Sequence, residues 1–238
     1  MEFARALVVY AHPDDAEFVC GGTVAAWTGA GTEVFYLCVT DGSAGWNGPG
    51  RTREEVARLR IPEQQAAGEV LGVSEIRFLG YGDGSLAASL DVRRDIAREV
   101  RRLRPDVIAT FDPSQLWSGR SYVNHPDHRA VGEATLAVVA CDAPTRLQFP
   151  ELLDEGLEPF DVPALWLACD TEAADRFVDI SDTFDLKVKA MQCHRSQLEN
   201  MRIDDIAERM RRWATEAGRP GGVELAEAFR TFAFGEEG

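Results

Sequence analysis

The sequence predicts an α/β fold, with a Rossmann-like, mostly parallel sheet flanked by helices in a single domain. Short apolar runs alternate with longer segments of helical periodicity over the first two-thirds of the chain, which is the pattern of βαβ units. The first apolar run, residues 6–11, is continuous and ends at charged residues, as a buried parallel strand does. The length of 238 residues fits one large α/β domain, and no repeat or linker interrupts it.

The elements are predicted in order from these runs and spacings. Strands are expected at residues 6–11, 33–40, 76–80, 106–111, 164–169 and 176–180. Helices are expected at residues 21–31, 51–71, 91–104, 126–141, 182–194 and 203–217. Pro126 falls in the first turn of its helix, where no helical hydrogen bond needs the N–H that proline lacks. Loops rich in glycine or polar residues follow the second, third and fourth strands, at residues 41–50, 80–84 and 112–124.

The composition excludes several classes of partner. A formal net charge of −15 and an isoelectric point near 4.7 argue against nucleic acid and anionic membrane surfaces, which both need a basic footprint. No apolar run approaches the roughly 18–20 residues that span a bilayer. The five cysteines form no CxxC pair and four lie in apolar stretches, so we expect them to be reduced and mostly buried. We therefore expect a cytoplasmic protein that acts on a small molecule.

Charged residues crowd the end of the first strand. A histidine and three carboxylates lie within six residues, from His12 to Glu17, directly after the apolar run. A buried cluster of this kind needs a neutralising partner such as a bound cation. Ligands of parallel sheets bind beyond the carboxyl ends of the strands, which is where the three later loops also lie. We therefore expect the loops after the first four strands to converge at the carboxyl ends of the strands, which we call the rim of the sheet, and to form one functional site there.

A second motif, HPDH at residues 125–128, follows the fourth strand. His125 and His128 are three residues apart at a helix start, and His12 and Asp15 have the same separation. Two imidazoles and one carboxylate from two loops, with positions left open to water, form the ligand set of a catalytic metal. Zinc suits this set, and so does ferrous iron. Either motif alone is commonly a turn or a helix cap, but two on one rim favour a metal site.

Neighbouring polar residues fit metal-assisted hydrolysis. Asp14 adjoins Asp15 and can take a proton from the attacking water. His125 lies one turn before His128 and can stabilise an oxyanion or protonate a leaving amine. Asp127 lies between these two histidines and can fix a histidine tautomer.

Several motifs occur in an order that resembles one known family: AHPDDAE, TDG, LGV with FLGYGDGSL, RPDVIATFDP, NHPDHRA and KAMQCHRSQ. Over roughly residues 5–200 the chain resembles the LmbE-like, or PIG-L, family of metal-dependent deacetylases. The resemblance implies a Rossmann-like fold, here a single LmbE-like deacetylase domain over residues 1–238. It also implies hydrolysis of N-acyl groups, chiefly on molecules that contain N-acetylglucosamine.

The resemblance assigns a role to each matching residue of the two motifs. It makes Asp14 the general base, and it makes His125 the electrophile or acid, supported by Asp127. The implied zinc ligands are His12, Asp15 and His128.

The implied substrate contacts are fewer. Arg60 matches an arginine that contacts the sugar in relatives, and Asn124 is expected to contact the substrate. Some relatives carry a tyrosine two residues before the first histidine of HPDH, as a further oxyanion donor. Val123 stands at that position and Tyr122 is one place away, so this donor is not assigned. The resemblance gives no clear role to Glu17.

The long loops offer candidates for the mouth of a substrate pocket. Trp46, Trp117 and Tyr122 can stack on a sugar ring, or can equally be ordinary exposed loop residues. His194, the fourth histidine, is by default a helix-end residue near the negative pole of the helix dipole.

We therefore predict a metal-dependent hydrolase that removes an N-acetyl or related N-acyl group from a small molecule containing an amino sugar. The expected metal is Zn²⁺, with Fe²⁺ or another divalent ion as the alternative, and a homo-oligomer is compatible with the sequence. Three other functions stay open: a thiol-conjugate amidase of the same family, a ferrous oxygenase with the same ligands, and a non-catalytic sugar-binding module. No GxGxxG or GxSxG motif supports a dinucleotide-dependent oxidoreductase or a serine hydrolase.

Overall fold

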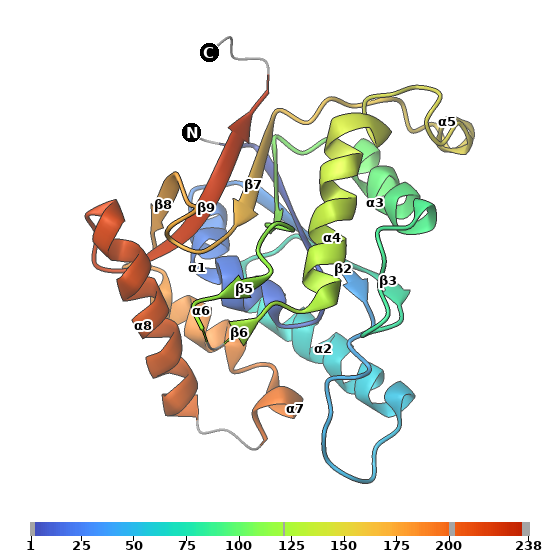
Figure 1. The fold of residues 1–238 in the computed structure, drawn as a ribbon. Coiled ribbons are helices and arrows are strands. Elements are labelled where there is room, and N and C mark those ends of the chain that lie inside the picture. The colour runs from blue at the N-terminus through green and yellow to red at the C-terminus, as the bar shows by residue number, and fades with distance from the viewer. Residues whose placement is uncertain (1–2, 121, 200–202, 235–238) are drawn as a thin grey trace.

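The structure is a computed structural model that describes residues 3–120, 122–199 and 203–234 (Figure 1). Its centre is a 7-stranded sheet in the order β3-β2-β1-β4-β7-β9-β8, and β5 and β6 form a separate hairpin. The strands are β1 (Arg5–Tyr10), β2 (Glu33–Thr40), β3 (Glu75–Tyr81), β4 (Val107–Phe111), β5 (Trp117–Ser118), β6 (Tyr122–Val123), β7 (Ala164–Ala168), β8 (Arg176–Asp179) and β9 (Ala226–Ala233). The helices are α1 (Asp15–Gly29), α2 (Arg53–Leu71), α3 (Leu90–Leu103), α4 (Pro126–Ala137) with a π-helical turn at Val138–Asp142, α5 (Glu151–Asp154), α6 (Phe184–Met191), α7 (Arg195–Leu198) and α8 (Ile203–Gly221).

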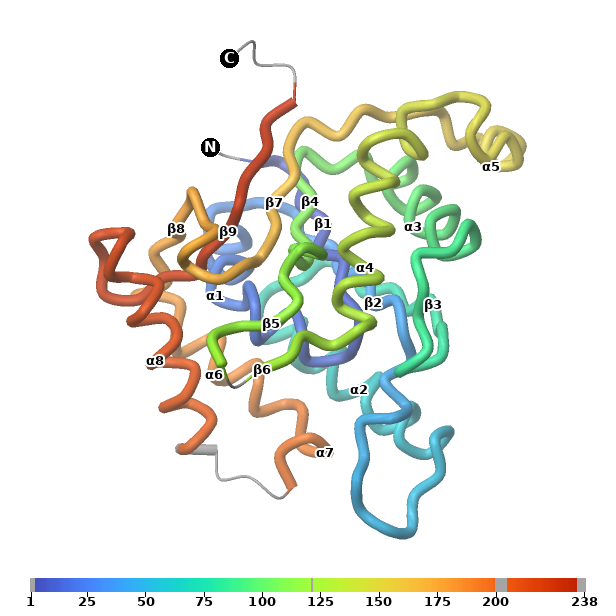
Figure 2. Tube along the Cα trace, viewed as in Figure 1, coloured from blue at the N-terminus to red at the C-terminus, as the bar shows by residue number. Residues whose placement is uncertain are grey.

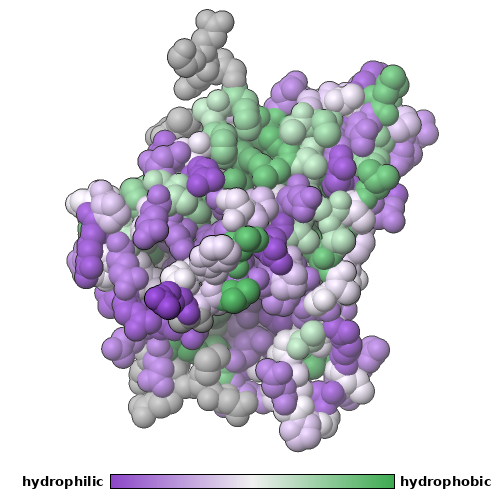
Figure 3. All heavy atoms as spheres, in the orientation of Figure 1, coloured by the Kyte–Doolittle hydropathy of each residue, from purple (hydrophilic) through white to green (hydrophobic). Residues whose placement is uncertain are grey.

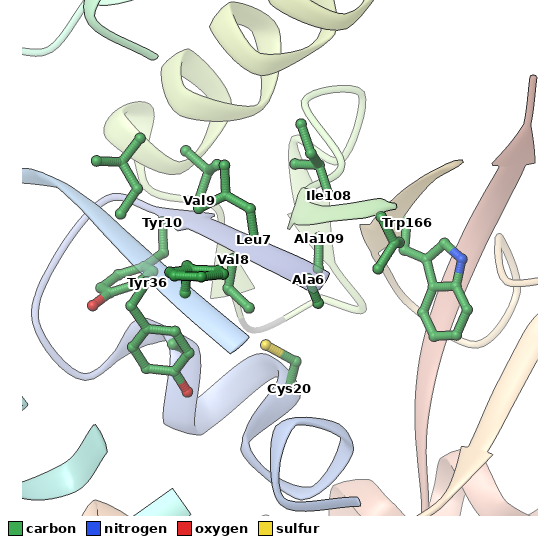
Figure 4. Packing of buried hydrophobic residues seen from close by; sticks show 14 of the residues in the cluster. Ala6, Leu7, Val8, Val9, Tyr10, Cys20, Tyr36, Ile108, Ala109 and Trp166 are labelled. Atoms are coloured by element: carbon green, nitrogen blue, oxygen red, sulfur yellow. The ribbon is translucent and has the colours of Figure 1, made fainter. Parts of the chain in front are cut away.

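Five neighbouring strands, β3, β2, β1, β4 and β7, run parallel, which confirms the predicted mostly parallel sheet. β1 and β4 are buried along nearly their whole length because helices cover both faces of the sheet. Successive side chains of β1 point to opposite faces, so Val8 and Tyr10 lie toward Cys20 of α1 whereas Leu7 and Val9 lie on the other face (Figure 4). The central strands therefore form the core of the molecule.

The strand order reverses between β1 and β4. The chain passes from β1 to β2 and β3 in one direction, then crosses to β4 and β7 on the other side of β1. Helices α1, α2 and α6 contact one another on one face of the sheet, and α3 and α4 contact one another on the other face (Figures 1 and 2). Open α/β sheets bind ligands at the carboxyl ends of the strands beside such a reversal.

β9 is a strand that the apolar pattern does not predict. It lies antiparallel between β7 and β8. Its sequence includes the charged residues Glu227 and Arg230 and only one β-branched residue, so the local strand signal is weak. Both charges have long-range partners: Arg230 lies 3.2 Å from Asp112, and Glu227 pairs with the buried Lys187. Tertiary contacts therefore decide the conformation of this segment.

Helix α1 begins at Asp15, earlier than the helix that the sequence predicts. Its backbone departs from helical geometry at Cys20, where φ is −145°. The Glu227 carboxylate accepts hydrogen bonds from the backbone N–H groups of Gly22 (3.0 Å) and Thr23 (2.7 Å), which caps the second half of α1. Asp15 to Glu17 of the charged motif therefore lie in the first turn of α1, whereas His12 to Asp14 form the turn that precedes it.

Smaller differences concern the loops and the cysteines. The predicted loop at 112–124 contains the β5–β6 hairpin, and α5 is a short helix that the sequence does not predict. All five cysteines are free, but only Cys20 and Cys38 are buried, so the prediction of mostly buried thiols is wrong for the other three. Within the described ranges, no helix has both the length and the apolar character needed to cross a membrane.

Candidate metal centre and catalytic site

The carboxyl ends of the parallel strands bring the predicted loops together. His12 follows β1, and the loop at residues 41–50 follows β2. Asp83 follows β3, and residues 124–128 come after β4 and the β5–β6 hairpin. Figure 3 shows a hydrophilic recess between this hairpin and the loop after β2. The two charged motifs of the sequence therefore meet at one place in the fold.

His12 lies buried among three carboxylates. Its Nδ1 is 3.2 Å from Asp15 Oδ2, and its Nε2 is 3.1 Å from Asp83 Oδ1 and 3.3 Å from Asp127 Oδ2. Burial lowers the pKa of His12, but the charges and hydrogen bonds of these carboxylates outweigh it and raise the pKa to about 12. This position therefore favours a positive charge, either on the imidazole or on a bound cation.

Asp15 connects the two motifs. Its Oδ2 accepts a hydrogen bond from the backbone N–H of His12 (2.7 Å), and its Oδ1 lies 3.1 Å from His128 Nε2. Burial alone would raise the pKa of Asp15, but the neighbouring imidazoles of His128 and His12 hold that pKa well below its usual range. A carboxylate thus bridges two imidazoles, one from the turn after β1 and one from the first turn of α4.

His128 is oriented by its other neighbours. The Asn124 amide group donates to the carbonyl oxygen of Gln115 (2.8 Å), so its Oδ1 faces His128 Nδ1 at 3.1 Å. The Nδ1–H group can donate to this oxygen, which leaves Nε2 as the ligand atom. Phe111 stacks on the imidazole, with ring centroids 4.2 Å apart. Asn124 is buried and holds His128, and its predicted contact with the substrate stays a prediction.

The donor atoms fit a divalent cation. Within the described part of the chain, two sets of side chains place nitrogen or oxygen atoms within 4.8 Å of one another. The sets are His12 with His125 and His128, and His12 with Asp83 and Asp127. Asp15 belongs to neither set, although one of its oxygens lies beside His12 and the other beside His128. Imidazole nitrogens and carboxylate oxygens are donors that suit zinc and ferrous iron, and the predicted trio His12, Asp15 and His128 stays a prediction.

His125 has the geometry of a hydrogen-bond donor to substrate. It caps α4, and its Nδ1 accepts from the backbone N–H of Asp127 (3.2 Å), so a neutral imidazole carries its proton on Nε2. Burial lowers the pKa of His125, and the charges of His12 and His128 lower it further. Its ring centroid is 4.7 Å from that of His12. His125 is more exposed than His12, which leaves it accessible to a ligand.

Asp127 holds two parts of the site together. Besides its contact with His12, its carboxylate accepts hydrogen bonds from the backbone N–H groups of Gly84 (2.7 Å) and Leu86 (3.2 Å). The side chain contacts His12 and not the two histidines of its own motif, and the predicted support of His125 by Asp127 stays a prediction. Asp127 therefore ties the loop after β3 to the loop after β1.

Asp14 lies at the start of α1 with an unusual backbone. Its φ is 107° and its ψ is −23°, and its carboxylate oxygen Oδ2 is 3.1 Å from Arg60 Nη2. Burial raises the pKa of Asp14 to about 6, although the Arg60 guanidinium opposes this rise. Arg60 is only 3% exposed and donates to the carbonyl oxygens of Pro13 and Gly42. Its predicted contact with a sugar therefore stays a prediction.

Glu17 and His194, which the sequence leaves unassigned, form a buried pair. Glu17 Oε2 lies 3.1 Å from His194 Nε2, and both side chains are 0% exposed. Burial lowers the pKa of His194, but its hydrogen bond to Glu17 outweighs this effect and raises the pKa. His194 lies between the end of α6 and the start of α7, and its backbone N–H donates to the carbonyl oxygen of Met191 (3.1 Å), so it is a residue at the C-terminal end of a helix, as expected, while its side chain faces Glu17.

Two site residues have little signal in the sequence. Asp83 lies in the loop at residues 80–84, which is predicted to reach the carboxyl ends of the strands. Nothing in the sequence of that loop distinguishes Asp83 as a neighbour of His12. Gln64 lies inside α2, where a glutamine is usually exposed to solvent, yet it is fully buried beside Asp14.

The aromatic residues around the recess differ in exposure. Trp117 is 63% exposed and Tyr122 is 47% exposed, both on the β5–β6 hairpin. Tyr122 Oη lies 3.4 Å from Asn124 Oδ1. Trp46 instead stacks under the guanidinium of Arg51, 3.9 Å from its ring centroid. The hairpin therefore offers exposed aromatic surface beside His125.

Comparison with known proteins identifies the family. A family model described as PIG-L, GlcNAc-PI de-N-acetylase, matches residues 7–139. The chain is 32% identical to a diacetylchitobiose deacetylase of Thermococcus kodakarensis, over 95% of this chain and 82% of that protein. It is also 32% identical to a 1D-myo-inositol 2-acetamido-2-deoxy-alpha-D-glucopyranoside deacetylase of Saccharomonospora viridis, over 81% of this chain and 84% of that protein.

A solved structure is similar along almost the whole chain. The N,N'-diacetylchitobiose deacetylase of Pyrococcus horikoshii superposes with a TM-score of 0.89 at 32% identity, covering 98% of this chain and 85% of that one. The fold, the motifs at its rim and these matches agree. The chain belongs to the PIG-L, or LmbE-like, family of deacetylases.

Proposed function

We propose that the protein is a metal-dependent hydrolase that removes the acetyl group from an N-acetylated amino sugar or one of its small conjugates. The observation that carries this proposal is the meeting of His12, Asp15 and His128 beside Asp14 at the carboxyl ends of β1 and β4. The relatives named above are deacetylases of acetylated sugar derivatives. They do not favour the thiol-conjugate amidase alternative.

Zinc is the metal that we propose, with Fe²⁺ or another divalent ion as the alternative. His12, Asp15 and His128 would hold it. When bound, such an ion lowers the pKa of water and polarises the carbonyl group of the amide.

The side chains around this position transfer the proton, stabilise the oxyanion and contact the sugar. Asp14 accepts the proton of the attacking water, because it adjoins Asp15 in the chain and its carboxylate is held by Arg60. His125 donates its Nε2–H to the oxyanion that develops on the carbonyl oxygen, since its Nδ1 is already an acceptor. The leaving amine then takes up the proton that Asp14 received. Exposed Trp117 and Tyr122 offer faces on which a sugar ring stacks.

Replacing His125 with alanine tests its role. We expect the variant to retain its metal and to lose about 10²–10³-fold in kcat, the usual effect of removing one oxyanion donor. Metal content is measured by elemental analysis on the same preparation. An unchanged kcat would remove His125 from the mechanism, and loss of the metal would make it a ligand in place of Asp15.

The substrate class is tested by an amine-release assay on a panel of N-acetylated compounds. The panel contains N-acetylglucosamine, its oligomers, its glycosides and N-acetylated amino acids as non-sugar controls. We expect the metal-loaded protein to release amine from the sugar compounds and not from the amino acids. A metal-loaded protein that binds these sugars without hydrolysing any of them would support the non-catalytic alternative. Oxygen consumption in the same assay would support the oxygenase alternative.

The other expected properties stay predictions. We infer that the substrate is a small, neutral or weakly polar molecule, consistent with the net charge of −15. The homo-oligomer and the cytoplasmic location remain open to measurement by light scattering and by cell fractionation.

A further inference from the structure

We propose that Gln64 is a positioning residue for Asp14, which it holds in a strained backbone conformation that sets the direction of the catalytic carboxylate. The inference rests on the proposed function for its catalytic consequence, but its structural part stands on contacts alone. Gln64 is fully buried in the middle of α2, and nothing in the predicted mechanism uses it.

The strain is a property of the Asp14 backbone. Its φ of 107° lies in the region that favours glycine, and among the described residues only Arg104 and Phe149 are other non-glycine residues with positive φ. Those two have φ of 51° and 55°, close to the ordinary left-handed well, whereas Asp14 lies well outside it. A conformation of this kind persists only where the surroundings impose it.

Two side chains of α2 hold this turn. Gln64 Oε1 accepts a hydrogen bond from the backbone N–H of Asp14 at 2.9 Å. Arg60, one turn earlier on the same helix face, donates to the carbonyl oxygen of Pro13 and contacts the Asp14 carboxylate at 3.1 Å. Gln64 and Arg60 therefore hold the same peptide group, between Pro13 and Asp14, at its N–H and at its carbonyl oxygen, and Arg60 also contacts the Asp14 side chain.

The orientation of Gln64 is itself determined. Its Nε2 donates to Glu17 Oε1 at 3.0 Å, and Glu17 in turn contacts His194. Glu17 and His194 are both 0% exposed, so no water competes for these hydrogen bonds. Because the backbone N–H of Asp14 can only donate, the amide oxygen of Gln64 must face it, and the amide nitrogen then faces Glu17. The buried pair, which has no other assigned role, thereby acts on Asp14 through Gln64.

The Gln64→Met variant tests the catalytic consequence of this inference. Methionine has a similar volume, but its thioether is only a weak acceptor for the Asp14 N–H and cannot donate to Glu17. We expect kcat to fall about 10–100-fold, as for other small misplacements of catalytic groups, while KM changes by less than about twofold. Thr28→Val is the matched control, because it also removes a hydrogen bond between α1 and α2, from Thr28 Oγ1 to Leu71 O at 2.6 Å. It is expected to lower the melting temperature without changing kcat.

A stability cycle, which compares the melting temperatures of Asp14 variants with and without Gln64, tests the structural part of the inference independently of activity. Asp14→Gly and Asp14→Ala both remove the carboxylate, but only glycine tolerates the φ of 107°. With Gln64 present we expect the glycine variant to melt about 2–10 °C higher than the alanine variant. With Gln64→Met in both, the difference is expected to shrink, because the released backbone can relax.

The outcomes separate this inference from the proposed function. A melting difference that is equal in the presence and absence of Gln64 would overturn the positioning role, and so would an unchanged kcat in an active Gln64→Met protein. A wild-type protein that hydrolyses no compound of the panel would contradict the proposed function, while the stability cycle would still decide whether Gln64 holds Asp14.

Discussion

Replacing Asp14 with asparagine is expected to lower kcat by about 10²–10⁴-fold while the metal is retained. The amide has nearly the shape of the carboxyl group, but it cannot accept a proton from the attacking water. Asp14 adjoins Asp15 in the chain, and its side chain is fixed by Arg60 at 3.1 Å, so the variant should keep the local geometry. Steady-state kinetics on an N-acetylated amino sugar, together with metal analysis, measures the effect.

A matched control is available at the opposite end of the same parallel strands. Asp106, just before β4, accepts hydrogen bonds from the backbone N–H groups of Ala4 and Arg5, both at 2.8 Å. Asp106→Asn makes the same chemical change far from the site and is expected to leave kcat unaltered. Wild-type kcat in Asp14→Asn would exclude Asp14 as the general base. Loss of the metal in that variant would indicate a ligand instead.

Replacing His12 with alanine is expected to abolish both metal binding and activity. His12 is the one residue common to both sets of possible ligands, and it contacts Asp15, Asp83 and Asp127. Its loss removes a nitrogen ligand and leaves three buried carboxylates without the positive charge that the imidazole carries. The measurement is the ratio of metal to protein after desalting, beside kcat.

The His125→Ala variant serves as the control for His12→Ala. Both substitutions remove an imidazole from the same small region, with ring centroids 4.7 Å apart. We expect only the His12 variant to lose the metal. A His12→Ala protein that binds metal as tightly as the wild type would refute the ligand assignment, whichever residues complete the set.

Much of the site is predictable from the sequence because it depends on the order of the strands. An apolar run that ends in charge indicates a buried parallel strand, and such strands share a rim at their carboxyl ends. His12 and His128 are more than a hundred residues apart in the chain. They meet because β1 and β4 are neighbours in the sheet, and Asp15 lies beside both imidazoles.

Other features depend on tertiary contacts that leave no local pattern. A glutamine inside a helix is usually exposed to solvent, so only the fold shows that Gln64 is buried against Asp14. Glu227 weakens the strand signal of β9, and its use as a cap for Gly22 of α1 joins residues 205 positions apart. The positive φ of Asp14 has little signal in residue type, because the surrounding contacts impose it.

The most direct test is to measure metal content and amine release on one preparation as the metal is removed and restored. We expect a chelator to abolish amide hydrolysis. We also expect activity to return in proportion to bound Zn²⁺ and to saturate at one ion per chain. Full hydrolysis of an N-acetylated amino sugar by protein that contains no metal would contradict the proposed metal-dependent mechanism.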